Sequence, residues 1–136
     1  MEQSQSTLRT EADRNRNVVL SFFHEGFVGL QPRRAFEHYV SQDFIEHKPD
    51  VALGTRETTI EYLERLIENL PEARWEMIRT IVESDFVFLH ARFTPAPDAP
   101  AYAIADVFRL HDSVIVEHWD VVGYPPTQNL NPNPRF

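Results

Sequence analysis

Three ionisable residues lie in a part of the chain whose pattern is that of buried β-structure. Between residues 105 and 120, apolar side chains alternate on both sides of a tight turn, which predicts two strands joined as a hairpin. Asp106, His118 and Asp120 fall within these strands, where an unpaired charge is costly to bury. A carboxylate in an apolar pocket becomes a stronger base, and a histidine can donate to an oxyanion or relay a proton near neutral pH. The three residues therefore predict acid–base chemistry.

The register of this hairpin decides which side chains share a face. The turn "LHDSV" fits a three-residue loop, with Ser113 at a position that glycine often holds. If Leu110 pairs with Val114, then Asp106 lies opposite His118 and Ile104 lies opposite Asp120. One face then carries Asp106, Phe108, Leu110, Val116, His118 and Asp120, and the other carries Val107, Arg109, Ile115, Glu117, Trp119 and Val121. We expect helices to cover the first face, so that its ionisable residues make one polar spot in a buried pocket.

The elements that must position these residues follow one another in two blocks. Apolar residues at helical spacing predict helices over 11–30 and 55–70, and Pro32 suits the first turn of a short helix over 32–40. Residues 41–54 form an extended piece that runs into a loop. Strand-like alternation follows in 73–84, 85–93, 101–110 and 114–122. Helices followed by hairpin-linked strands predict an α+β domain with an antiparallel sheet. We expect a single domain over 11–136 after a flexible stretch at 1–10.

Composition restricts the partners and the compartment. The 136 residues include no cysteine, which excludes disulfides and cysteine nucleophiles, and 21 acidic against 13 basic residues give a formal net charge of −8. A net negative surface disfavours nucleic acid and anionic membranes as partners. No stretch is long and apolar enough to span a membrane, and the polar N-terminus lacks a signal-peptide pattern. These features predict a soluble, cytoplasmic protein.

Both faces of the predicted hairpin carry large apolar side chains, although a sheet with one solvated face should alternate more cleanly. We therefore expect helices on one face and a second copy of the chain on the other, because two-fold homodimers are the commonest oligomers. Ile115, Trp119 and Val121 would form that interface.

Several motifs resemble those of a known family. They are "FIEHKP" at 44–49, "ADVFRL" at 105–110, "VEHWDVV" at 116–122 and the terminal "NPNPRF", and together they are similar to the SnoaL-like polyketide cyclase branch of the nuclear transport factor 2-like superfamily. The resemblance implies a cone-shaped, curved antiparallel sheet wrapped around about three N-terminal helices, with an internal pocket. It also implies that the pocket holds His47, Asp106, His118 and Asp120, and that His90 faces it.

The family includes polyketide cyclases that close rings by aldol addition, and its wider relatives include dehydratases, isomerases and epoxide hydrolases. The resemblance therefore implies acid–base catalysis without a cofactor, in which a base removes a proton beside a carbonyl and a donor stabilises the enolate. Asp106 or Asp120 would be the base, His118 or His47 the acid or oxyanion donor, and His90 a supporting residue. Lys48, where the family usually has a neutral residue, would alter the pocket mouth.

A largely apolar substrate with one or two oxygens is expected, because the helices bring a phenylalanine-rich lining. The residues expected to bind it are Phe22, Phe44, Tyr39, Tyr62 and Trp75.

Three alternatives stay open. Asp106 and His118 could be a satisfied buried pair that only holds two strands in register. The same fold could serve as a small-ligand-binding or dimerisation module without chemistry. His118 and Asp120 have the spacing of non-haem iron ligands, and His47 or His90 could complete such a site.

Overall fold

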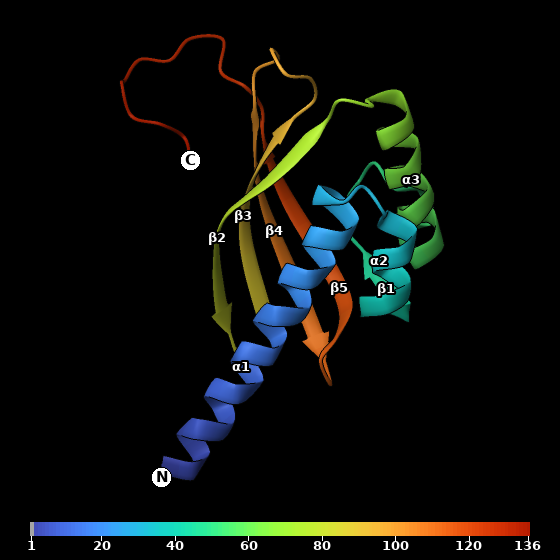
Figure 1. Cartoon of the computed structure of the whole chain (residues 1–136), viewed down its shortest axis with the longest axis vertical. Helices are drawn as coiled ribbons and strands as arrows, with labels where there is room; N and C mark the ends of the chain where they lie inside the picture. Colours follow the sequence, from blue (N-terminus) through green and yellow to red (C-terminus); the bar gives the residue numbers. More distant parts are fainter. Residues whose placement is uncertain (1) are drawn as a thin grey trace.

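A curved, unclosed sheet of five strands packs against three helices, which all lie on one of its faces (Figure 1). The computed structural model describes residues 2–136, with side chains described from Thr10 onward. The helices are α1 Glu2–Phe23, α2 Pro32–Tyr39 and α3 Arg56–Asn69, and the strands are β1 Val40–Glu46, β2 Arg74–Glu83, β3 Phe86–Thr94, β4 Tyr102–His111 and β5 Val114–Gly123. The predicted α+β class is confirmed.

Local sequence signals explain where the helices begin and end. The helix expected over 11–30 begins at Glu2 and ends at Phe23, and a π-helical turn over His24–Val28 continues it. Pro32 opens α2 because its missing N–H is not needed in a first turn. Thr55 caps α3 by accepting a hydrogen bond from the Thr58 N–H at 3.2 Å. No helix of the described chain is long and apolar enough to cross a bilayer. The flexibility expected of residues 1–10 stays a prediction.

The sheet has one more strand than the sequence predicted, and one pair of strands is parallel. The strand order is β1-β5-β4-β3-β2, with antiparallel pairing from β5 to β2. The extended piece after α2 forms β1, which pairs parallel to β5 at the sheet edge. The predicted antiparallel sheet is confirmed for the four strands β2 to β5, and the parallel β1–β5 pair at its edge is an addition that was not predicted. Because β1 and β5 are separated in the sequence by α3 and three strands, no turn motif between them predicts that they pair.

The β4–β5 hairpin was predicted with the wrong register. His111 pairs with Val114, so the loop has two residues, Asp112 and Ser113, both with positive φ (50° and 62°). Beyond a bulge between Arg109 and Leu110, Asp106 lies opposite Asp120 and Phe108 opposite His118. The register is thus two residues away from the predicted one along most of the hairpin. A shift of two keeps each side chain on its face, because side chains alternate with a period of two.

The bulge changes the face of one residue that matters for the predicted dimer. Ile115 pairs with Leu110, is 0% exposed and belongs to the hydrophobic core, so its assignment to an outer interface is wrong. Trp119 and Val121 lie on the outer face as expected, with Val121 70% exposed. Phe86, Phe88 and Ile81 also leave much of their surface uncovered.

The inner face of the sheet and the helices together form one core. Val87, Leu89 and Ala91 alternate along β3 and are fully buried, and they pack in the same cluster as Val19 and Phe23 of α1. Burying the valine, leucine and phenylalanine side chains of this set stabilises the fold by roughly 1.5–3 kcal/mol each. The core holds the helices at a fixed distance from the sheet, and the space left between them contains the site.

Candidate active site

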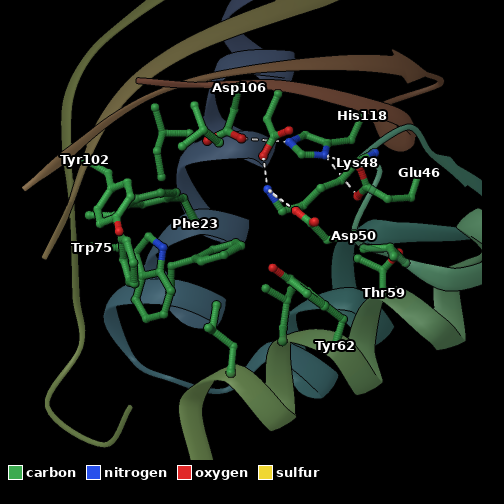
Figure 2. A pocket seen from close by; sticks show the side chains of 18 of the residues that line it. Phe23, Glu46, Lys48, Asp50, Thr59, Tyr62, Trp75, Tyr102, Asp106 and His118 are labelled. Atoms are coloured by element: carbon green, nitrogen blue, oxygen red, sulfur yellow. Dashed lines mark hydrogen bonds and ion pairs between the residues drawn. The ribbon is translucent and has the colours of Figure 1, made fainter. Parts of the chain in front are cut away.

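A cavity of about 360 Å³ lies between the helices and the inner face of the sheet. Its wall is mostly apolar. In Figure 2 the side chains of Glu46, Lys48, Asp106 and His118 gather on one side of it, across from Trp75. An apolar cavity with a few convergent polar groups is the usual form of a small-molecule site.

Aromatic rings from the first helical segment build much of the apolar wall. Phe22 and Phe23 end α1, and the π-helical turn brings Phe27 against both, edge-on to Phe22 at 5.8 Å and stacked on Phe23 at 5.3 Å between ring centroids. Trp75 of β2 meets Phe27 edge-on at 5.6 Å. Such ring contacts contribute about 0.5–1.5 kcal/mol each beyond the area they bury. The wall is therefore preformed rather than assembled around a ligand.

His118 lies between two carboxylates at the centre of the polar side. Its Nε2 is 2.8 Å from Asp106 Oδ1, and its Nδ1 is 2.7 Å and 3.0 Å from the two carboxylate oxygens of Glu46. All three side chains are largely buried, Glu46 at 3% exposed, His118 at 13% and Asp106 at 15%. The predicted contact between Asp106 and His118 is confirmed, although His118 makes it diagonally across the hairpin.

This arrangement keeps the imidazole charged. Burial alone would lower the pKa of His118, but the hydrogen bonds and charges of Asp106 and Glu46 outweigh it and raise the pKa to about 10. At neutral pH His118 is therefore an imidazolium that donates both of its N–H groups to protein carboxylates. It has no donor left for a bound molecule, so the predicted role of direct acid or oxyanion donor does not fit its geometry.

Asp106 has an oxygen left over. Its Oδ1 accepts from His118, and no other hydrogen bond to its carboxylate is made within the part of the chain whose side chains are described. Since Asp106 lines the cavity, the second oxygen is available to accept a proton or a hydrogen bond from a bound molecule. The carboxylate is oriented by an imidazolium and faces an apolar space, which is a suitable arrangement for a base.

A second ion pair lies beside the first. Lys48 Nζ is 2.8 Å from Asp120 Oδ2 and 3.6 Å from Asp50 Oδ2, and both Lys48 and Asp120 line the cavity. Burial opposes the charge of Lys48, but the hydrogen bond and charge of Asp120 raise its pKa above the ordinary value. Tyr62 of α3 points its hydroxyl into the cavity, and burial raises its pKa, so it stays protonated at neutral pH (Figure 2). Tyr62 can therefore donate a hydrogen bond.

His47 does not face the cavity as predicted. It lies on the outer side of the sheet, where its ring stacks on Trp119 at 4.7 Å and its Nε2 is 2.7 Å from Glu117 Oε2. Strand alternation explains the error, because Phe44 and His47 are an odd number of residues apart and cannot both point inward from one regular strand. Phe44 is the one that lines the cavity.

His90 also lies on the outer face. It pairs with Ala105, hydrogen-bonds to Arg79 and stacks against Phe136 at 5.9 Å, so it contacts the C-terminal segment rather than the cavity. Arg135 anchors the same segment by donating to the carbonyls of Ala101 and Gly123 at 3.0 Å and 3.2 Å. The "NPNPRF" motif thus serves to dock the tail.

The predicted substrate-binding set is mostly correct in position. Phe22, Phe44, Tyr62 and Trp75 line the cavity. Tyr39 does not line it, because it ends α2 and packs against the core from outside, beside His38.

Sequence reasoning missed Glu46, although a signal was present. In "FIEHKP" Phe44 and Glu46 share a face by strand alternation, so a cavity-facing Phe44 implies a cavity-facing Glu46. For Lys48 the sequence indicates only that a charged residue replaces the family's usual neutral one at the pocket mouth. Its ion pair with Asp120 could not be predicted without knowing that β1 pairs with β5.

The proposed iron ligands do not converge. His118 and Asp120 face the cavity, but His47 and His90 are on the opposite side of the sheet. Among the residues with described side chains, no group of three or more histidine or acidic side chains could hold a metal ion. His118 and Asp120 share a face because they are two residues apart on β5, and this spacing alone does not make a metal site.

The chain belongs to the SnoaL-like domain family, whose model matches residues 7–118. This agrees with the curved, unclosed sheet and with the cavity between the sheet and the helices. No curated protein matches the chain.

Solved structures show the same fold. A protein from a Jannaschia species, assigned to the SnoaL-like polyketide cyclases, is 25% identical with a TM-score of 0.68 over 82% of this chain and 86% of its own. A Bacillus cereus protein assigned to the polyketide cyclases is 18% identical, with a TM-score of 0.71 over 83% and 76% of the two chains. A nuclear transport factor 2-like protein of unknown function from Mesorhizobium loti is 18% identical, with a TM-score of 0.66 over 83% and 93%.

Proposed function

We propose that this chain is an acid–base enzyme that needs no cofactor and acts on a largely apolar, oxygenated small molecule, in a reaction of the aldol cyclase, dehydratase or isomerase type. The observation that carries the proposal is the carboxylate of Asp106, held at one oxygen by the His118 imidazolium and open to the cavity at the other. The polyketide cyclase assignment of the Jannaschia relative supports the same class of chemistry.

In the proposed reaction Asp106 removes a proton from the carbon beside a substrate carbonyl. The electron pair of the broken C–H bond forms a new carbon–carbon double bond, the π pair of the carbonyl moves to its oxygen to give the enolate, and the proton resides on Asp106. The Tyr62 hydroxyl donates a hydrogen bond to the enolate oxygen. His118 acts as a positioning residue, because it holds one oxygen of the Asp106 carboxylate through a hydrogen bond and does not itself touch the substrate. Glu46 in turn holds His118 in its charged form.

The test follows proton removal directly, so that the natural substrate need not be known. The purified protein is incubated with cyclic aryl ketones in deuterated water, and loss of the proton beside the carbonyl is followed by NMR. Asp106→Asn should slow this exchange by about 10²–10⁴-fold while ketone affinity is retained. Asp98→Asn, an exposed carboxylate outside the cavity, is the matched control and should exchange at the parental rate. Equal rates in the parent and Asp106→Asn would refute the assignment.

A ligand-binding module without catalysis is the second candidate. The observation that favours it is that both cations of the cavity already have a partner within the protein. His118 is paired with Asp106, and Lys48 is paired with Asp120. In that case ketones would bind the parent and Asp106→Asn equally well, and neither protein would exchange protons above the buffer rate.

We also propose that the chain acts in the cytoplasm as a homodimer through the outer sheet face. Phe86, Phe88, Trp119 and Val121 give this face an apolar character, whereas Ile115 is no part of it. Sedimentation should show a dimer for the parent and a monomer for Val121→Asp. A monomeric parent at micromolar concentration would contradict the proposal.

A further inference from the structure

The Lys48–Asp120 ion pair closes one part of the cavity wall. Lys48 follows β1, and it reaches across to Asp120 near the end of β5, a separation of 72 residues in the sequence. The Lys48 side chain is 19% exposed and that of Asp120 is 9% exposed, so both charges have little water around them. Asp50, at 65% exposed, lies on the solvent side of the same lysine. The pair is thus part of the wall itself, and its charges act on whatever enters the cavity.

The charges that line the cavity are unequal in number. Its two cations, Lys48 and His118, are each hydrogen-bonded to a carboxylate. Its four carboxylates are Glu46, Asp50, Asp106 and Asp120. Carboxylates therefore outnumber cations, and neither cation of the lining is free to receive an anion. In a partly desolvated space, like charges at several ångströms repel far more strongly than they do in water.

We propose that the cavity selects uncharged molecules over ionised carboxylic acids, and that Asp120 determines this selection by occupying Lys48. The inference deepens the proposed function, because it specifies the substrate class of that site. An entering carboxylate would have to separate Lys48 from Asp120 and would leave the Asp120 charge buried without its partner. A neutral ketone or ester meets no such cost, since it needs only the apolar wall and a hydrogen-bond donor.

The substitution Asp120→Asn should reverse the selection. Asparagine keeps the shape of the side chain and removes its charge, so Lys48 becomes a cation with only the exposed Asp50 nearby. A cation in this position is a receptor for an anion. Asp120 thus excludes acids by holding Lys48, and its removal should convert the same wall into an acid-binding one.

The experiment compares naphthalene carboxylate with its methyl ester, two probes of nearly the same shape that differ in charge. Isothermal titration calorimetry at neutral pH measures both affinities for the purified full chain. The parent should bind the ester at least tenfold more tightly than the acid. In Asp120→Asn the acid should bind about tenfold more tightly than it binds the parent, with the ester within about threefold of its parental affinity.

Two further variants test whether Lys48 is the group that binds the acid in Asp120→Asn. The double variant Lys48→Gln with Asp120→Asn should lose the gained acid affinity. Asp50→Asn, which removes the exposed partner, should change acid affinity less than Asp120→Asn does. Circular dichroism confirms that each variant is folded, and the ester–acid comparison in the parent needs no variant at all.

The proposal is overturned if the parent binds the acid as tightly as the ester, or if folded Asp120→Asn gains no affinity for the acid. It is also overturned if neither probe binds, because an aromatic-lined cavity of about 360 Å³ should admit the ester. These are binding measurements, so they are independent of turnover. If Asp106→Asn exchanged protons at the parental rate while the ester–acid selection held, catalysis by Asp106 would fail and the selectivity would stand.

Discussion

Alkaline pH should destabilise this protein through a single histidine. The folded-state pKa of His118 is raised from 6.5 to about 10 by its two carboxylate partners, against the opposing effect of burial. Between these values the folded chain holds a proton that the unfolded chain has released. The stabilisation from the charged His118 is therefore complete below pH 6.5, decreases as pH rises and is lost above pH 10.

The size of the effect follows from the width of this interval. Where the folded state binds one proton more than the unfolded state, each rise of one pH unit lowers the free energy of unfolding by ~1.4 kcal/mol. A shift from 6.5 to about 10 therefore corresponds to roughly 5 kcal/mol in total. That loss is a large part of the 5–15 kcal/mol that typically stabilises a domain. Lys48 and Tyr62, whose pKa values are also raised, titrate above this interval.

Urea unfolding followed by tryptophan fluorescence, repeated at half-unit pH steps from about 6.5 to 10, measures this dependence. The slope should be close to −1.4 kcal/mol per pH unit for the parent and near zero for His118→Gln. His111→Gln, in which an exposed histidine of the adjoining turn is changed, should keep the parental slope. Glu46→Gln should move the loss of stability to lower pH, because it removes one of the two carboxylates that raise the pKa of His118. A flat parental profile, or an NMR titration of His118 near 6.5, would refute the reasoning.

Two local features give simpler predictions, each testable by thermal or urea unfolding of a single variant. Ser113→Gly should stabilise the fold by about 0.5–1 kcal/mol, because Ser113 has a φ of 62° that glycine adopts without strain; an unchanged or lower stability would contradict this. Thr55→Ala should destabilise the fold by ~1 kcal/mol, since it removes the cap of α3, whereas Thr55→Ser should restore most of the loss; equal effects of the two substitutions would argue against capping.

Local patterns were sufficient to predict the elements and the inner face of the last hairpin. Alternation in β4 and β5 placed Asp106, His118 and Asp120 on one face, and the helical spacing of the phenylalanines placed Phe22 on the cavity wall. These inferences need only the period of an element, so an error of two residues in register did not spoil them.

The parts of the site that could not be predicted depend on contacts between distant segments. Glu46 and Lys48 meet His118 and Asp120 only because β1 pairs with β5, which no short-range signal announces. The placement of His90 rested on the family resemblance alone. Alternation could not correct it, because both faces of β3 carry large apolar side chains, and Val87 and Leu89 turned out to be the inner ones. Ile115 was misplaced because a bulge interrupts the alternation.

The joining of β1 to β5 determines when the site can exist at all. Glu46 and His118 are 72 residues apart, so a chain still emerging from the ribosome presents its phenylalanine-rich helices and β1 long before their partner strand is made. Contacts of such sequence separation form late and slowly, and apolar surface exposed meanwhile is prone to aggregate. Until β5 is made, Glu46 and Lys48 lack His118 and Asp120 as partners, so the ion pairs of the cavity cannot form. The polar side of the cavity is therefore completed only when β5 joins β1.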